Sequence, residues 1–185
     1  EYHDINNINK YQITVSKKTE TPTWFKEGIL YHIFVDRFNK TGKINNPKKN
    51  SFIYANWEDT PMYIKNKENE VIRWDFHGGN LKGIISKLNY LKSLGISVIY
   101  LSPIFKSQSN HKYDTGDYKT IDPMFGDEEI FKELIYKAGK KGINIILDGV
   151  FSHTGDDSIY FNKYGNYDSL GAYQSENSKY YSWYN

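Results

Sequence analysis

The feature that most constrains the fold is the run Ile-Asn-Ile-Ile-Leu at residues 143–147, which follows Gly142. Its apolar side chains fall on both faces of an extended chain, as is typical of a buried strand in a parallel sheet. Directly after it the chain becomes polar, with Asp148, Ser152 and His153. Ligand sites of parallel sheets and barrels lie at this end of their strands. The run therefore predicts either a ligand site or a strand that Asp148 merely caps, followed by an ordinary loop histidine.

Two more buried strands and two helices precede this run. Residues 29–35 and 96–101 are apolar stretches that read as strands. Residues 81–94 and 127–141 carry apolar side chains at helical spacing. The order strand, helix, strand, helix, strand predicts two right-handed βαβ units and hence a parallel sheet.

Local signals predict where the helices begin and end. Asn80 is expected to cap the first helix, and Gly95 to adopt a left-handed conformation after it. The second helix is expected to begin near Asp127 and to be terminated by Gly142.

The remaining segments lack helical periodicity. Residues 39–75 are rich in Asn, Lys and Pro and are expected to form one long loop, and 106–120 a shorter polar loop. Alternation predicts a short strand at Tyr11–Val15. No fourth strand is expected after residue 153.

Bulk composition excludes several classes of function. The 24 basic and 22 acidic residues leave a net charge of +2, which predicts no general attraction to nucleic acid or to an acidic membrane surface. No apolar run approaches the ~20 residues of a membrane-spanning helix. The absence of cysteine excludes a disulfide framework and thiolate metal sites, and it leaves the cellular compartment open. The 17 tyrosines suit a wet groove for flat polar ligands.

Polar residues gather after all three predicted strands. Asp36 and Arg37 follow the first, residues 111–114 follow the second, and Asp148 and His153 follow the third. Because the carboxyl ends of parallel strands share one edge of the sheet, we expect these side chains to lie together. This co-location favours a functional site.

Three chemistries compete for this site. Metal-dependent hydrolysis lacks a supporting histidine spacing. Phosphate binding could use Gly78-Gly79 before a helix, but the pair matches no phosphate-binding motif, and a tight turn explains it better. Sugar binding gives the most residues natural roles, with Tyr113 as a stacking face and His153, Asp114 and Arg37 as hydrogen-bond partners.

Several motifs together resemble the α-amylase family of glycoside hydrolases, closest to its neopullulanase, cyclomaltodextrinase and amylopullulanase branch. The resemblance runs from about Trp24 to the end of the sequence. It implies an α/β fold, the N-terminal portion (about three strands) of a (β/α)8 TIM barrel. Residues 22–153 would form these first three units, 154–185 the start of an inserted domain after strand three, and 1–21 a linker or the tail of a preceding β domain. The motifs are Asp36-Arg37-Phe38, Gly78-Gly79-Asn80-Leu81, Tyr100-Leu101-Ser102-Pro103, Asn110-His111-Lys112-Tyr113-Asp114, Ile121-Asp122-Pro123 and Asp148-Gly149-Val150-Phe151-Ser152-His153.

The resemblance also implies a role for each matched residue. Tyr113 would stack under the glucose at the cleavage subsite, and His153 would hydrogen-bond the 6-hydroxyl of that sugar. Asp148 would brace the site by pairing with an arginine on a later strand, and Asp114 would hold the Tyr113 loop. The supporting residues would be Asp148, Arg37, His111 and Ser152.

Two departures from the family pattern affect these expectations. Ser152 stands where the family usually has Asn, which shortens one hydrogen-bonding side chain beside the site. A calcium ion, the only cofactor considered, would be bound near Asn39, Gly78 and Asn80. The corresponding loops here carry Lys43 and Asn80 in place of carboxylates, which weakens the case because calcium prefers several carboxylate oxygens.

The resemblance implies retaining hydrolysis of α-1,4 or α-1,6 bonds in starch, pullulan, cyclodextrin or maltooligosaccharides, which needs a nucleophilic Asp and an acid/base Glu. These residues belong to strands four and five, outside this sequence, so the chain alone is predicted to be inactive. Its expected partners are an α-glucan oligosaccharide and the remainder of the enzyme, or a second copy, covering the open barrel. The alternatives are a non-catalytic glucan-binding module and a complete small α/β protein.

Overall fold

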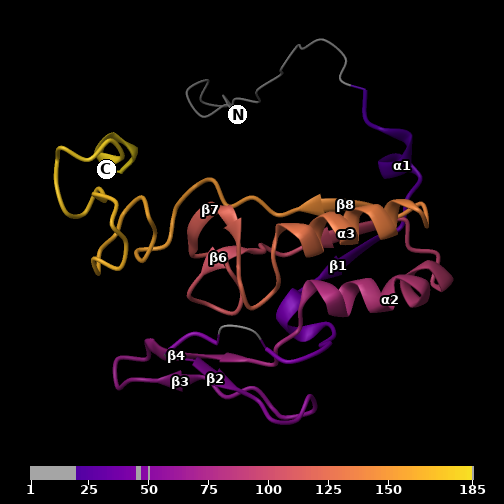
Figure 1. Ribbon diagram of the computed structural model, residues 1–185, viewed down its shortest axis with the longest axis horizontal. Coiled ribbons are helices and arrows are strands. Elements are labelled where there is room, and N and C mark those ends of the chain that lie inside the picture. The colour runs from indigo at the N-terminus through magenta and orange to yellow at the C-terminus, as the bar shows by residue number, and fades with distance from the viewer. Residues whose placement is uncertain (1–19, 45–46, 50, 185) are drawn as a thin grey trace, which may run out of the picture.

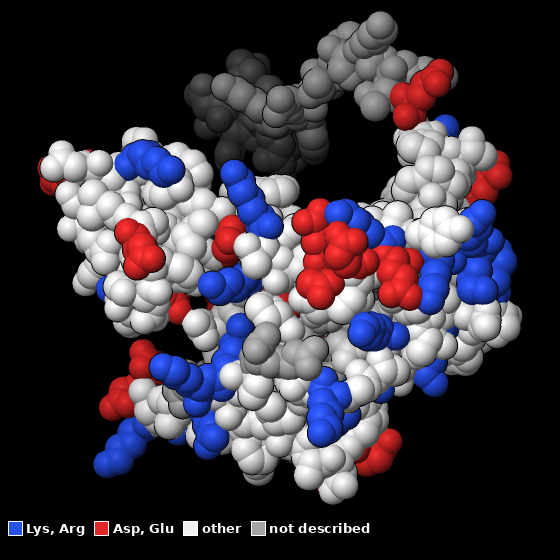
Figure 2. Space-filling model, in the orientation of Figure 1, with Lys and Arg blue, Asp and Glu red and all other residues white. Residues whose placement is uncertain are grey.

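A computed structural model describes residues 20–44, 47–49 and 51–184 (Figure 1). The predicted strand at Tyr11–Val15 lies outside these residues. None of the described helices is long and apolar enough to cross a membrane. On the visible face, Lys and Arg are interspersed with Asp and Glu (Figure 2).

The centre of the fold is a parallel sheet of β1 (Leu30–Ile33), β5 (Val98–Leu101) and β8 (Asn144–Leu147), in that order. The register aligns His32 with Tyr100 and Tyr100 with Ile146. The predicted parallel sheet is therefore confirmed, although its first strand ends earlier than expected. Val35–Arg37 instead forms the 3-10 turn η2.

Helices α2 (Leu81–Ser93) and α3 (Glu128–Gly139) pack beside each other on this sheet. The side chain of Asn80 accepts a hydrogen bond from Gly83 N at 2.7 Å, and that of Asp127 accepts one from Ile130 N at 2.9 Å. Gly95 and Gly142 have φ angles of 79° and 66°. The predicted caps and left-handed glycines are confirmed. They could be predicted from sequence because each depends only on neighbouring residues.

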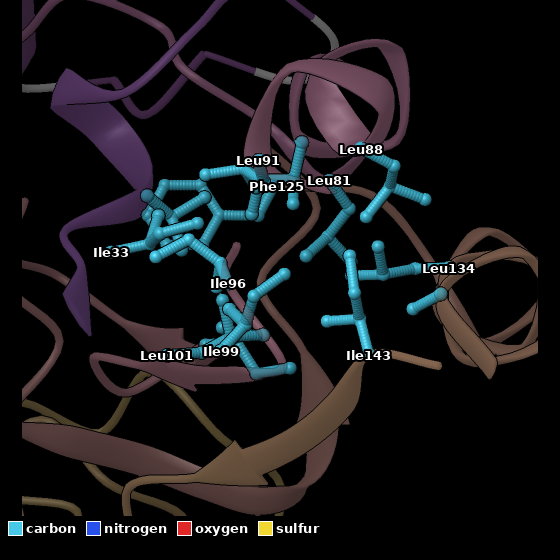
Figure 3. Packing of buried hydrophobic residues seen from close by; sticks show 14 of the residues in the cluster. Ile33, Leu81, Leu88, Leu91, Ile96, Ile99, Leu101, Phe125, Leu134 and Ile143 are labelled. Carbon is cyan, nitrogen blue, oxygen red and sulfur yellow. The ribbon is translucent and has the colours of Figure 1, made fainter. Parts of the chain in front are cut away.

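The hydrophobic core lies between the two helices and one face of the sheet (Figure 3). Alternate strand residues point into it, with Ile33, Ile99 and Leu101 almost fully buried. The other core residues labelled in Figure 3 are Leu81, Leu88, Leu91, Ile96, Phe125, Leu134 and Ile143. On the opposite face of the sheet, Leu30 is 46% exposed.

Two predicted loops contain strands, so those predictions were wrong. Residues 39–75 include β2 (Ser51–Ile53), β3 (Ile64–Lys65) and most of β4 (Val71–Phe76), paired in the order β2-β4-β3. Residues 106–120 carry most of the antiparallel pair β6 (Phe105–Ser107) and β7 (Thr115–Ile121). Strands β2, β3 and β6 have only two or three residues, too few for a period-two pattern. The longer β4 and β7 are stabilised by pairing with these strands, which no local pattern encodes.

Short elements complete the described chain. The helix α1 (Thr23–Lys26) precedes β1, and the 3-10 turn η3 (Tyr181–Trp183) lies near the end. Among the described residues after 153 there is no strand, as predicted. Buried Asn162 organises this segment by donating to the carbonyls of Tyr167 and Ser169, both at 2.8 Å.

Candidate functional site

The centre of the candidate site is a hydrogen bond between Tyr113 and Asp148. Asp148 follows β8, and its backbone N–H donates to Leu101 O on β5 at 3.0 Å. The Tyr113 hydroxyl donates to Asp148 Oδ2 at 2.8 Å, while the tyrosine side chain remains 39% exposed. Burial and the Asp148 carboxylate raise the pKa values of both Tyr113 and Tyr100. Asp148 thus fixes one edge of an accessible aromatic ring.

His153 holds the backbone of the same tyrosine. Its Nε2 lies 3.0 Å from the Tyr113 carbonyl oxygen, which can only accept, so Nε2 carries the hydrogen. Its Nδ1 then accepts from the Ser152 hydroxyl at 3.2 Å. The structure therefore brings Tyr113, Asp148, His153 and Ser152 together.

Asp114 closes the loop that carries Tyr113. Its carboxylate accepts from Ser107 Oγ at 2.9 Å and from the backbone N–H groups of Gln108 and Ser109 at 3.2 and 3.1 Å. The Ser109 hydroxyl also donates to it. Asp114 therefore bonds to three residues, 107–109, of the loop that leads to Tyr113.

His111 supports Tyr113 from the other side. Its Nδ1 accepts from the Tyr113 backbone N–H at 3.1 Å, so the hydrogen is on Nε2. Burial and the positive charge of Lys112 lower the pKa of His111, although the carboxylate of Asp114 acts to raise it. The neutral form of His111 is therefore favoured. The ring of Trp74 packs edge-on against it, with centroids 4.9 Å apart.

Arg37 lies in a separate buried cluster. Its guanidinium contacts Asp36 and Asp75, each at 2.9 Å, and His77 Nδ1 at 2.6 Å. Asp36 also accepts hydrogen bonds from the backbone N–H groups of His77 and Gly78. Burial raises the pKa of Asp36, although these two bonds and the charge of Arg37 act to lower it. No bond recorded among the described residues joins Arg37 to Tyr113, Asp148 or His153.

Several contributors to the site carried no signal that sequence reasoning used. Tyr100 approaches Asp148, and His32 Nε2 lies 2.8 Å from Ser102 Oγ at the ends of β1 and β5. Asn110 Nδ2 donates to the Asp75 carbonyl at 2.8 Å, which joins β4 to the Tyr113 loop. The motifs that carry the resemblance include Tyr100, Ser102 and Asn110 but assign them no role, and His32 lies outside those motifs.

The residues considered for calcium are engaged in packing. Asn80 Oδ1 accepts from Gly83 N and from Thr41 Oγ1, and Asn39 Nδ2 donates to Gly83 O at 3.1 Å. A hollow of about 230 Å³ beside Asn80 is lined by Lys43 and Lys82, and no group of three or more His, Asp or Glu in the described ranges is arranged to hold a metal ion. Calcium binding stays a prediction that this arrangement does not favour.

The Gly78-Gly79 pair has a packing explanation. A Cβ on Gly79 would lie 2.0 Å from the Val35 carbonyl oxygen, so no larger residue fits without movement. Gly78 has a φ of 86°, in the left-handed region. These constraints account for both glycines as a tight turn.

Comparison with known families identifies the chain. The model of the α-amylase catalytic domain matches residues 32–185. The chain belongs to the α-amylase family. It forms part of an α-amylase catalytic domain, consistent with a partial TIM barrel.

The curated relatives of this α-amylase-family chain are glycosidases. It is 50% identical over 182 residues to an amylopullulanase of Thermoanaerobacterium saccharolyticum, covering 90% of this chain and 14% of that protein. It is 41% identical over 164 residues to a cyclomaltodextrinase of Thermoanaerobacter pseudethanolicus, covering 89% of this chain and 25% of that protein. The chain thus spans a quarter or less of these relatives.

Solved structures agree. The cyclic α-maltosyl-(1→6)-maltose hydrolase from Arthrobacter globiformis matches with a TM-score of 0.72 and 31% identity, over 90% of this chain and 33% of that one. The type III pullulan hydrolase from Thermococcus kodakarensis matches with a TM-score of 0.68 and 34% identity, over 87% and 28%.

Proposed function

We propose that this chain supplies the first three strands of a retaining α-glucan hydrolase barrel and part of its glucose-binding subsite. The observation that carries the proposal is the accessible Tyr113 ring, held at its hydroxyl by Asp148, at its carbonyl by His153 and at its amide by His111. Aromatic faces with fixed polar neighbours suit flat ligands rich in hydroxyls. The names of the relatives support α-1,4 or α-1,6 glucans as substrates.

The chain's own residues would bind and orient the sugar. Tyr113 would lie under the glucose ring, and His153 would turn toward its 6-hydroxyl or hold Tyr113 in place. The nucleophilic Asp and the acid/base Glu would come from later strands, since Asp36 and Asp114 are committed to backbone N–H groups and Asp148 to Tyr113. Alone, the 185 residues would not hydrolyse a glucan.

The test is Tyr113→Ala in the complete polypeptide that contains these residues. Aromatic side chains that stack on nucleic-acid bases contribute about 1–3 kcal/mol, and a comparable contribution with a sugar ring would lower kcat/KM for maltooligosaccharides about 5- to 150-fold. Tyr173→Ala, which removes a 59% exposed ring from the 154–185 segment, is the matched control and should leave kcat/KM unchanged. Equal activity of the Tyr113→Ala protein and wild type would refute the proposed role.

A second candidate is a non-catalytic glucan-binding module. It is favoured by Tyr113, whose bonds to Asp148 and His153 lie entirely within this chain. Calorimetric titration of the isolated chain with maltooligosaccharide should then give heat at millimolar ligand. A titration without heat excludes the module.

A further inference from the structure

The residue before Tyr113 is a lysine in an unusual position. Lys112 has no exposed surface, and its φ of 65° is in the left-handed region that residues other than glycine rarely adopt. Its backbone N–H donates to Ser109 Oγ at 2.9 Å. This backbone conformation sets the direction in which the chain enters Tyr113.

The side chain of Lys112 is fixed at its far end. Its Nζ donates to Ser109 O at 2.9 Å and pairs with Asp122 Oδ2 at 2.8 Å. The ammonium lies 5.2 and 4.8 Å from the ring centroids of Phe76 and Phe125. The left-handed turn is thus held from both its backbone and its side chain.

Asp122, which follows β7, anchors this lysine to two other parts of the fold. The same Oδ2 accepts from Lys48 Nζ at 2.8 Å and from Ser107 N at 3.2 Å, and Oδ1 accepts from Met124 N at 3.0 Å. Burial would raise the pKa of Asp122, but the two ammonium groups outweigh it, so the net shift is downward. Asp122 therefore remains a charged anchor.

A buried charge is a costly way to fill this space. Burial lowers the pKa of Lys112 to about 8 despite the opposing charge of Asp122. Replacing a whole buried ion pair by well-packed apolar residues is often neutral or stabilising, so the Lys112–Asp122 pair is not needed merely to fill the gap between Phe76 and Phe125. Packing alone does not explain a lysine here.

We propose that Lys112 is a positioning residue, which uses its ion pair with Asp122 to hold the 109–113 turn and thereby aims the Tyr113 ring at the glucose unit. This inference rests on the proposed function, and it adds to the glucose-binding subsite a residue that does not itself contact the sugar. Lys112 acts only through the backbone of Tyr113.

The first test is Lys112→Met in the complete polypeptide, with maltohexaose as substrate. At pH 7, kcat/KM should fall about 10- to 100-fold, the range that misplacing a positioning group by an ångström costs. Circular dichroism at the assay temperature should show that the variant is folded, because Lys48 Nζ still pairs with Asp122. Lys137→Met, which removes an exposed ion pair with Glu133 on α3, is the control and should leave kcat/KM unchanged.

The second test is the pH profile of the wild-type protein, which does not depend on a variant folding. Its kcat/KM should decline as the pH rises through about 8, while circular dichroism stays constant, and Lys112→Met should lack this decline. The charged or titratable groups facing Lys112 are Asp122, Lys48, Asp114, Asp36 and His111, and loss of the decline in Lys112→Met assigns it to Lys112.

The outcomes separate the two proposals. A wild-type polypeptide that hydrolyses no glucan refutes the proposed function. An active wild type whose profile is flat from pH 7 to about 9.5, or a folded Lys112→Met protein with wild-type kcat/KM, overturns the inference alone. A Lys112→Met protein that keeps the wild-type decline above about pH 8 also overturns it.

Discussion

Tyr113→Phe removes only the hydroxyl that donates to Asp148 Oδ2 at 2.8 Å and keeps the stacking face. A hydrogen bond to a charged group contributes about 1.5–3 kcal/mol. Because Tyr113 is 39% exposed, water screens the bond, and we take the lower end, about 1.5 kcal/mol. In the complete polypeptide this corresponds to about a tenfold loss of kcat/KM for a maltooligosaccharide.

A double-mutant cycle isolates this bond. Tyr113→Phe removes the donor and Asp148→Ala removes the acceptor, so their combined effect should be smaller than the sum of the single effects by about 1–1.5 kcal/mol. Tyr164→Phe is the control, because its hydroxyl makes a similar bond to Asp156 Oδ2 at 2.7 Å in the 154–185 segment. Additive effects of the two site substitutions would refute the reasoning.

Two further predictions concern stability. Burial lowers the pKa of His111 from its ordinary 6.5, so the folded protein favours neutral His111. The stability that this preference provides is fully present above pH 6.5 and is lost as the pH falls from there through the lowered pKa. The melting temperature of His111→Gln should therefore depend less on pH between 7 and 5 than that of wild type, and parallel curves would contradict this. The isolated 185-residue chain, with Leu30 on the open face of its sheet, should self-associate at micromolar concentration. Exposing several hundred Å² of apolar surface would cost on the order of 10 kcal/mol, and light scattering from a monodisperse, cooperatively unfolding 21.7 kDa monomer would contradict that prediction.

The parts of the fold that sequence predicts are those with local causes. The caps Asn80 and Asp127 bond to residues three positions away, and the two helices follow from apolar spacing. The parallel sheet follows from the order of these elements. By contrast, β2 is a strand because it pairs with β4, more than 20 residues later, and no local pattern encodes that partner.

The site divides in the same way. Tyr113, His153 and Asp114 could be proposed because motifs and strand ends marked them, and the structure brings them together. Trp74, which packs on His111, and Lys48, which pairs with Asp122, could not, because both come from a segment predicted to be one long loop. Arg37 was marked by its strand end, but its charge is engaged by Asp36 and Asp75.

The most direct test of the central claim is a side-by-side assay of the complete polypeptide and the isolated 185-residue chain on starch, pullulan and cyclodextrin. We expect the complete polypeptide to release reducing sugar from at least one of them, and the isolated chain to release none. Sugar release by the purified isolated chain, or none by a folded complete polypeptide, would contradict the account.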